Sequence, residues 1–139
     1  MIHPGLFPDE ITRQIEEIDH PNLWMTLDFG HLYLSAHIAG LDFLSTIENQ
    51  AGFIRHIHLS DNFGKNSDID DSPKNSRMEK ALRGKGDCHL PPGMVTMPIR
   101  ECLQRLPAYS GYIVFEVRPE FREYLPESIV KLKELVSSI

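Results

Sequence analysis

Two kinds of hydrophobic pattern alternate along the chain. Short apolar runs rich in β-branched residues predict strands at residues 23–28, 53–59 and 112–117. Apolar residues that recur every three or four positions predict helices at residues 8–18, 32–49, 98–106 and 126–137. Gly40 is a candidate break in the second helix, and Ile129, Leu132 and Val136 are the expected buried face of the last. Strands that are separated by helices join through right-handed parallel crossovers, so the pattern predicts an α/β chain.

A long polar stretch, residues 62–86, interrupts this alternation and has no clear periodicity. Its last part carries four basic residues and one acidic residue, namely Arg77, Lys80, Arg83 and Lys85 against Glu79. The favoured interpretation is a solvated loop, and the alternative is a lid over an anionic substrate. We treat residues 1–139 as a single domain that contains this loop.

Length and composition limit the classes of protein to consider. The chain has 139 residues, of which 41% are hydrophobic and 24% charged, as in ordinary folded domains. A complete (β/α)8 barrel needs roughly 250 residues, so the chain can supply only part of one. The net charge of −6 disfavours nonspecific binding to nucleic acid. Two cysteines, too few for a disulfide framework, favour a cytoplasmic setting, and no apolar run is long enough to span a membrane.

Each predicted strand ends in polar residues that could carry chemistry. They are Asp28 and His31 after the first strand, His56 and His58 on one face of the second, and Glu116 and Arg118 on one face of the third. Taken singly, each has a structural explanation: a helix cap for Asp28, a core position for either histidine, and an ion pair between Glu116 and Arg118. The ends of parallel strands meet at one edge of a sheet, so we expect these side chains to converge.

Converging carboxylates have a clear chemical requirement. Like charges repel, so Asp28 and Glu116 can lie together only where a cation holds them. A ligand set of carboxylates and histidines without cysteine suits Mn²⁺, Mg²⁺, Co²⁺ or Zn²⁺, and the carboxylates favour the harder of these ions. Asp87 and His89, at the end of the polar stretch, form a further pair of candidate ligands. The sequence therefore predicts a divalent metal site at this edge of the sheet.

Four segments follow one another in a distinctive order. They are Leu-Asp-Phe-Gly-His at 27–31, His-Ile-His-Leu-Ser-Asp-Asn at 56–62, Gly-Asp-Cys-His-Leu-Pro-Pro-Gly at 86–93 and Gly-Tyr-Ile-Val-Phe-Glu-Val at 111–117. In this order they resemble the C-terminal part of the xylose isomerase-like TIM barrels, which include sugar-phosphate isomerases and epimerases and the endonuclease IV type of abasic-site nuclease. The resemblance implies a partial (β/α)8 barrel of about three parallel β/α units. One segment departs from the family, because Leu-Pro-Pro-Gly stands where Leu-Gly-Glu-Gly is usual.

The resemblance also implies roles for individual residues. Those that match the metal ligands of the family's sixth, seventh and eighth strands are Asp28, His58 and Glu116. Glu116 also matches one of the two carboxylates that move a proton. Those that match positions for extra zinc ions in the nuclease, or for substrate contacts in epimerases, are His31, Asp87 and His89. His56 and Arg118 are further candidates for metal or substrate binding. The family's fifth-strand glutamate, which supplies the other carboxylate, has no counterpart here.

A metal-dependent isomerase or epimerase of sugars or sugar phosphates, working through a cis-enediolate, is the function that the resemblance implies. A zinc-dependent abasic-site nuclease is the second hypothesis, and a noncatalytic remnant or interaction module is the third. The edges of a three-stranded sheet would be unpaired, so we expect self-association or a missing N-terminal half to complete the barrel. The expected partners are a small sugar or sugar phosphate and a second chain, with no nucleic acid and no membrane.

Overall fold

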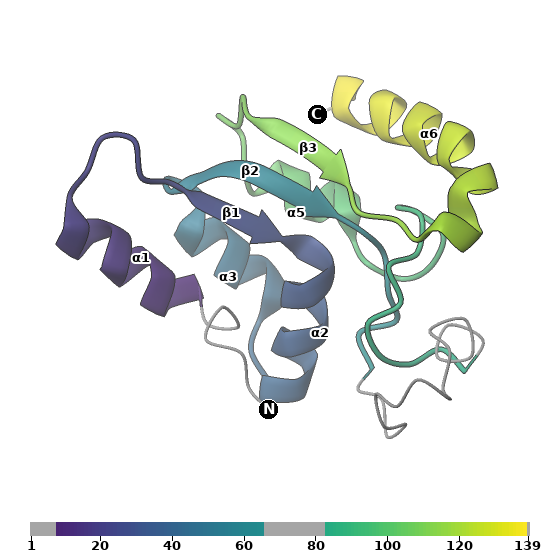
Figure 1. Ribbon diagram of the computed structural model, residues 1–139, viewed down its shortest axis with the longest axis horizontal. Helices are drawn as coiled ribbons and strands as arrows, with labels where there is room; N and C mark the ends of the chain where they lie inside the picture. Colours follow the sequence, from purple (N-terminus) through teal and green to yellow (C-terminus); the bar gives the residue numbers. More distant parts are fainter. Residues whose placement is uncertain (1–7, 66–82, 139) are drawn as a thin grey trace.

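Three parallel strands form one sheet in the order β1-β2-β3 (Figure 1). The structure is a computed structural model that describes residues 8–65 and 83–138. Its elements are α1 (Pro8–Ile18), β1 (Met25–Asp28), α2 (Phe29–Ala39), α3 (Phe43–Gln50), β2 (Ile54–Leu59), α5 (Ile99–Gln104), β3 (Tyr112–Phe115), the 3-10 helix η2 (Pro119–Tyr124) and α6 (Leu125–Ser137). The predicted α/β class and the parallel strand order are confirmed.

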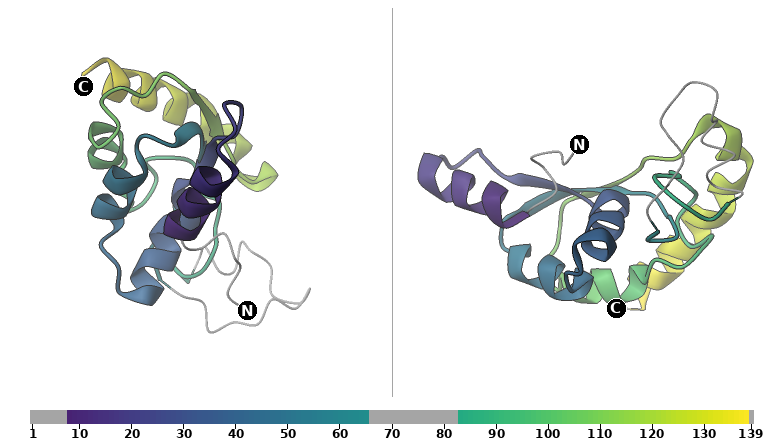
Figure 2. Two further views of the ribbon diagram at one scale, coloured as in Figure 1. Left: turned by 90° about the vertical axis from the view of Figure 1, so that its left-hand side faces the viewer. Right: turned by 90° about the horizontal axis from the view of Figure 1, so that it is seen from below.

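The helices pack on one face of the sheet. Leu27, Ile57 and Leu59 point into this side and are almost fully buried, together with the apolar residues of α2, α3 and α5. The strands' alternate residues point to the other face, where the register aligns Thr26, His56 and Tyr112. No helix of residues 8–65 or 83–138 covers this second face (Figure 2). Its apolar side chains are consequently exposed, and Tyr112 is 78% accessible to solvent.

Gly40 breaks the second predicted helix, as its position in the sequence indicated. It adopts a φ of 68° and a ψ of 29°, and its N–H donates to the carbonyl of Ala36, which ends α2. Glycine occupies this left-handed conformation without the steric cost of a Cβ. Asp42 then caps α3 by accepting a hydrogen bond from the N–H of Ser45.

The buried face of α6 differs from the prediction. Ile129 and Val136 are 41% and 50% exposed, whereas Ser128 is buried and Leu132 and Leu135 pack against the core. Leu132 faces inward as predicted, but Ser128 and Leu135 share that face with it in place of Ile129 and Val136. Among the described elements α6 packs chiefly on α5 and η2, and Ile129, Val130 and Val136 remain exposed, which the apolar periodicity alone does not indicate.

The long polar stretch is partly described. Residues 66–82, which include Arg77 and Lys80, lie outside the described residues. Its two flanks meet where the N–H of Gly86 donates to the carbonyl of Lys65 at 2.6 Å. The chain then returns to the sheet through an antiparallel bridge between Asp61 and Leu90. In the described part of the chain, no helix has the length and apolar character needed to cross a membrane.

Candidate metal centre

Asp28, His58 and Glu116 come together at the C-terminal edge of the sheet. Asp28 and His58 are register partners at the ends of β1 and β2, and Glu116 directly follows β3. One ligand atom of each lies within 4.8 Å of those of the other two. The Nδ1 atom of His58 lies 3.1 Å from Oε2 of Glu116 and 3.9 Å from Oδ2 of Asp28. The predicted convergence of these three residues is what the structure shows, and we call them the first group.

Helix capping fixes the position of Asp28. Its Oδ1 accepts a hydrogen bond of 2.9 Å from the backbone N–H of His31 at the start of α2. The turn is also held against the segment that follows β2, because the side-chain amide of Asn62 donates to the carbonyl of Gly30 at 2.6 Å. A Cβ at Gly30 would collide with the side chain of Ser60, so this close approach needs glycine. The helix cap that could have explained Asp28 alone thus coexists with its place in the first group.

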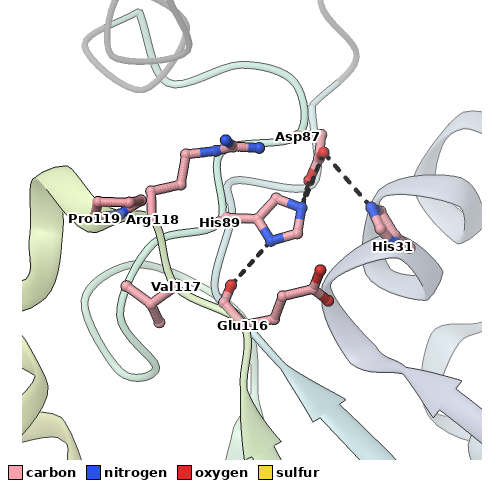
Figure 3. A pocket seen from close by; sticks show the side chains of 7 residues that line it. All are labelled: His31, Asp87, His89, Glu116, Val117, Arg118 and Pro119. Atoms are coloured by element: carbon pink, nitrogen blue, oxygen red, sulfur yellow. Dashed lines mark hydrogen bonds and ion pairs between the residues drawn. The ribbon is translucent and has the colours of Figure 1, made fainter.

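A second group consists of His31, Asp87 and His89, whose candidate ligand atoms also lie within 4.8 Å of one another. The Nε2 atoms of His31 and His89 lie 3.5 Å and 3.1 Å from the carboxylate of Asp87 (Figure 3). His31 also reaches Oδ2 of Asp28 through Nδ1, at 3.1 Å. The two groups are therefore joined by a direct contact between a member of each.

The tautomer of His89 follows from its hydrogen bonds. Its Nδ1 lies 2.9 Å from the carbonyl oxygen of Glu116, which can only accept, so Nδ1 carries a proton and donates it. The lone pair of the neutral ring is then on Nε2, the atom that faces Asp87. This is the usual arrangement of a histidine that ligates a metal. The backbone of His89 has a φ of 48°, an uncommon conformation of the kind found at functional sites.

Asp61 holds the loop that carries the second group. This fully buried carboxylate accepts hydrogen bonds from the backbone N–H groups of Gly93, Val95 and Met97, at 2.9–3.2 Å. Its own backbone exchanges two hydrogen bonds with Leu90. Burial raises the pKa of Asp61, although these hydrogen bonds oppose the rise. The sequence places Asp61 after a strand but contains no signal for this supporting role.

Mutual hydrogen bonds set the ionisation of the second group. Those with Asp28 and Asp87 raise the pKa of His31 from 6.5 to about 10, and the one with Asp87 raises the pKa of His89. Burial works to raise the pKa of Asp28 and Asp87, but hydrogen bonds from the histidines outweigh it and hold both values below the usual range. The carboxylates are therefore charged at neutral pH, and a cation that binds the histidines must displace protons.

A pocket of about 460 Å³ opens beside the second group (Figure 3). The residues that line it are His31, Asp87, His89, Glu116, Val117, Arg118 and Pro119. Arg118 is thus at the site, but the predicted alternative of an ion pair with Glu116 is not observed, since Glu116 contacts His58 instead. His56 stacks edge-on against His58, with ring centroids 5.2 Å apart, and belongs to neither group.

The donor sets of both groups fit a divalent cation. Each combines carboxylate oxygens with imidazole nitrogens, the ligands that suit Zn²⁺, Mn²⁺ or Co²⁺, and neither includes a cysteine.

Comparison with known proteins identifies the family of the chain. A family model described as a xylose isomerase-like TIM barrel matches residues 2–135, a span that contains every candidate ligand. No curated protein and no solved structure matches the chain. The predicted family is confirmed, and the three parallel strands with their helices are part of its barrel.

Proposed function

Because the chain belongs to the xylose isomerase-like TIM barrel family, we propose that it takes part in metal-dependent isomerisation or epimerisation of a sugar or sugar phosphate. The observation that supports this most strongly is the first group, Asp28, His58 and Glu116, at the edge of the sheet where TIM-barrel enzymes have their active sites. The family includes sugar isomerases and epimerases as well as abasic-site nucleases. The two cysteines of the chain favour a cytoplasmic setting for this activity.

In this proposal Asp28, His58 and Glu116 hold a divalent ion, namely Mn²⁺, Mg²⁺, Co²⁺ or Zn²⁺. The ion would stabilise negative charge that develops on adjacent oxygens of the substrate. Glu116 is the proton-transfer group, since its side chain is 45% exposed and lines the pocket with one oxygen directed at His58. The other carboxylate oxygen can take a proton from substrate carbon and return it.

A second carboxylate must come from outside the described residues. Epimerisation moves a proton between the two faces of a carbon, and the first group offers one base on one side. The bare face of the sheet and the outer edges of β1 and β3, unpaired among the described residues, support a partner that completes the site. We propose that a second polypeptide, either another copy of this chain or the remaining strands of a barrel, covers this face.

Solvent exchange tests the proposed chemistry without needing the second carboxylate. The protein is incubated in D₂O with Mn²⁺ and a panel of ketoses and ketose phosphates, and NMR follows the hydrogen beside the carbonyl. We expect metal-dependent exchange of this hydrogen, and Glu116→Gln should lower the rate at least about 100-fold. The matched control is Glu123→Gln, an exposed position of η2. Exchange at equal rates in both variants would refute the role of Glu116.

The second group favours an alternative function, a zinc-dependent abasic-site nuclease. His31, Asp87 and His89 match the positions that bind extra zinc ions in that branch of the family, and the structure brings them together. The net charge of −6 opposes binding to DNA. Cleavage of an abasic duplex with Zn²⁺, together with no exchange into any ketose, would favour the nuclease. Absence of both activities from the assembled protein would favour a noncatalytic module.

A further inference from the structure

Arg118 is held in a fixed position relative to both groups. It lies two residues beyond Glu116, and its backbone N–H donates to the carbonyl of His89 at 3.2 Å. Pro119 follows it and opens η2, which restricts the backbone at this point. The backbone of Arg118 is therefore held between the end of β3 and the loop that carries Asp87 and His89.

Among the residues that the structure describes, the guanidinium group of Arg118 has a nitrogen whose hydrogen-bonding capacity is unused. Figure 3 shows the side chain extending along the pocket with its end toward Asp87. Within residues 8–65 and 83–138, Nε of Arg118 is buried without a hydrogen-bond partner, and no carboxylate forms an ion pair with the group. A buried N–H of this kind is unfavourable until an acceptor reaches it.

The positive charge of Arg118 does not help the other polar groups of the pocket to bind a cation. His31, Asp87, His89 and Glu116 form a donor set that attracts a cation, and a permanent positive charge beside them opposes a metal rather than holding one. A planar guanidinium with several N–H groups is instead suited to bind two oxygens of one oxyanion. The pocket is open, so such an oxyanion can arrive with a ligand.

We propose that Arg118 binds the phosphate group of a phosphorylated sugar substrate in the pocket beside the candidate metal centre. The inference rests on the proposed function for the identity of the substrate, and it narrows the choice from sugars in general to sugar phosphates. Phosphate oxygens supply an acceptor for Nε of Arg118 and can also accept from its terminal nitrogens. Val117 and Pro119 form the apolar part of the same wall.

The test compares Arg118→Gln with Arg122→Gln in the whole chain. Arg122 is exposed in η2, so its substitution removes the same charge four residues away. Calorimetry measures the binding of inorganic phosphate, a ketose phosphate and the same ketose without phosphate. We expect Arg118→Gln to lower the affinity for inorganic phosphate and for the ketose phosphate at least about tenfold. Arg122→Gln should change these affinities less than about twofold. Arg118→Lys keeps the positive charge but loses the planar set of N–H donors, so its affinity for the phosphate ligands should be intermediate.

Three results would overturn this assignment. They are equal effects of the two glutamine variants, equal binding of the ketose with and without phosphate, and Arg118-dependent binding of acetate or an abasic oligonucleotide in place of the ketose phosphate. Zn²⁺ titration of the same variants separates this inference from the proposed function. Arg118-dependent phosphate binding by a chain that binds no metal would leave the phosphate site standing and refute the metal-dependent enzyme. Metal-dependent exchange of a ketose phosphate at the same rate in wild type and in Arg118→Gln would support the metal-dependent enzyme and refute the phosphate site.

Discussion

The Nδ1 atom of His58 lies 3.1 Å from Oε2 of Glu116, although 58 residues separate them in the sequence. His58 ends the central strand β2, and Glu116 follows the edge strand β3. The parallel pairing of these strands aligns Leu59 with Phe115, so the two side chains leave the same edge of the sheet. The contact between them is therefore a product of the topology and does not depend on any local sequence pattern.

His58 and His56 offer a matched pair of substitutions. Both lie on the uncovered face of β2 and their rings touch, but only His58 belongs to a group of candidate ligands among the described residues. We expect His58→Ala to lower the affinity for Zn²⁺ or Mn²⁺ at least about tenfold, because it removes one of three ligands. His56→Ala should leave the affinity within about twofold. Calorimetry measures both, and equal losses would show that the metal lies elsewhere.

His31 predicts a pH-dependent term in the stability of the metal-free chain. Its pKa in the folded protein is about 10, above the ordinary value of 6.5, because of hydrogen bonds to Asp28 and Asp87. A raised histidine pKa stabilises the fold fully below pH 6.5, and this contribution is lost as the pH rises through 10. Because the His31 side chain is 47% exposed, solvent screening limits the effect to about 1 kcal/mol.

The comparison of wild type with His31→Gln isolates this term. Urea unfolding with a chelator present should give a difference in unfolding free energy at pH 6 that shrinks toward zero near pH 10.5. A difference that is constant across this range, or that grows with pH, would mean that the charged histidine does not stabilise the loop of Asp87.

Asp61 predicts a large loss of stability on truncation. Asp61→Ala would remove the acceptor of the backbone N–H groups of Gly93, Val95 and Met97, of which the Met97 bond is buried and the other two are partly buried. The expected cost is about 2–3 kcal/mol, since a buried N–H left without an acceptor costs about 1–3 kcal/mol and the loss of the two partly buried bonds adds to it. Asp42→Ala, which removes an exposed helix cap, is the control and should cost less. Denaturant unfolding of the two variants measures the difference, and similar losses would contradict the account of the loop.

The bare face of the sheet predicts association. Tyr112 is 78% exposed and Val114 is 43% exposed on the face that no described helix covers. We expect the purified chain to form dimers or larger species at micromolar concentration, and Tyr112→Glu to shift them toward the monomer. Tyr124→Glu changes an exposed tyrosine of η2 and should have little effect. Sedimentation of the wild type as a well-folded monomer would contradict self-association.

The sequence predicted the parts of the site that the strands carry. Asp28, His58 and Glu116 occupy strand ends, and parallel topology is sufficient to bring strand ends together. The placement of Asp87 and His89 beside His31 could not be predicted. It depends on the three backbone hydrogen bonds that Asp61 accepts and on the positive φ of His89. Neither feature has a sequence periodicity. On α6, Leu132 was predicted correctly, and Ile129 and Val136 were predicted wrongly because the elements that pack on this helix leave part of its apolar surface exposed.

Crystals soaked in Zn²⁺ and measured at its absorption edge test the central claim, that Asp28, His58 and Glu116 hold a divalent ion. The account predicts an anomalous peak about 2.0–2.2 Å from a nitrogen of His58 and from carboxylate oxygens of Asp28 and Glu116. The same peak should be lost in His58→Ala and retained in His56→Ala. A wild-type crystal with no peak among these three residues, at a zinc concentration that occupies other sites, would contradict the account.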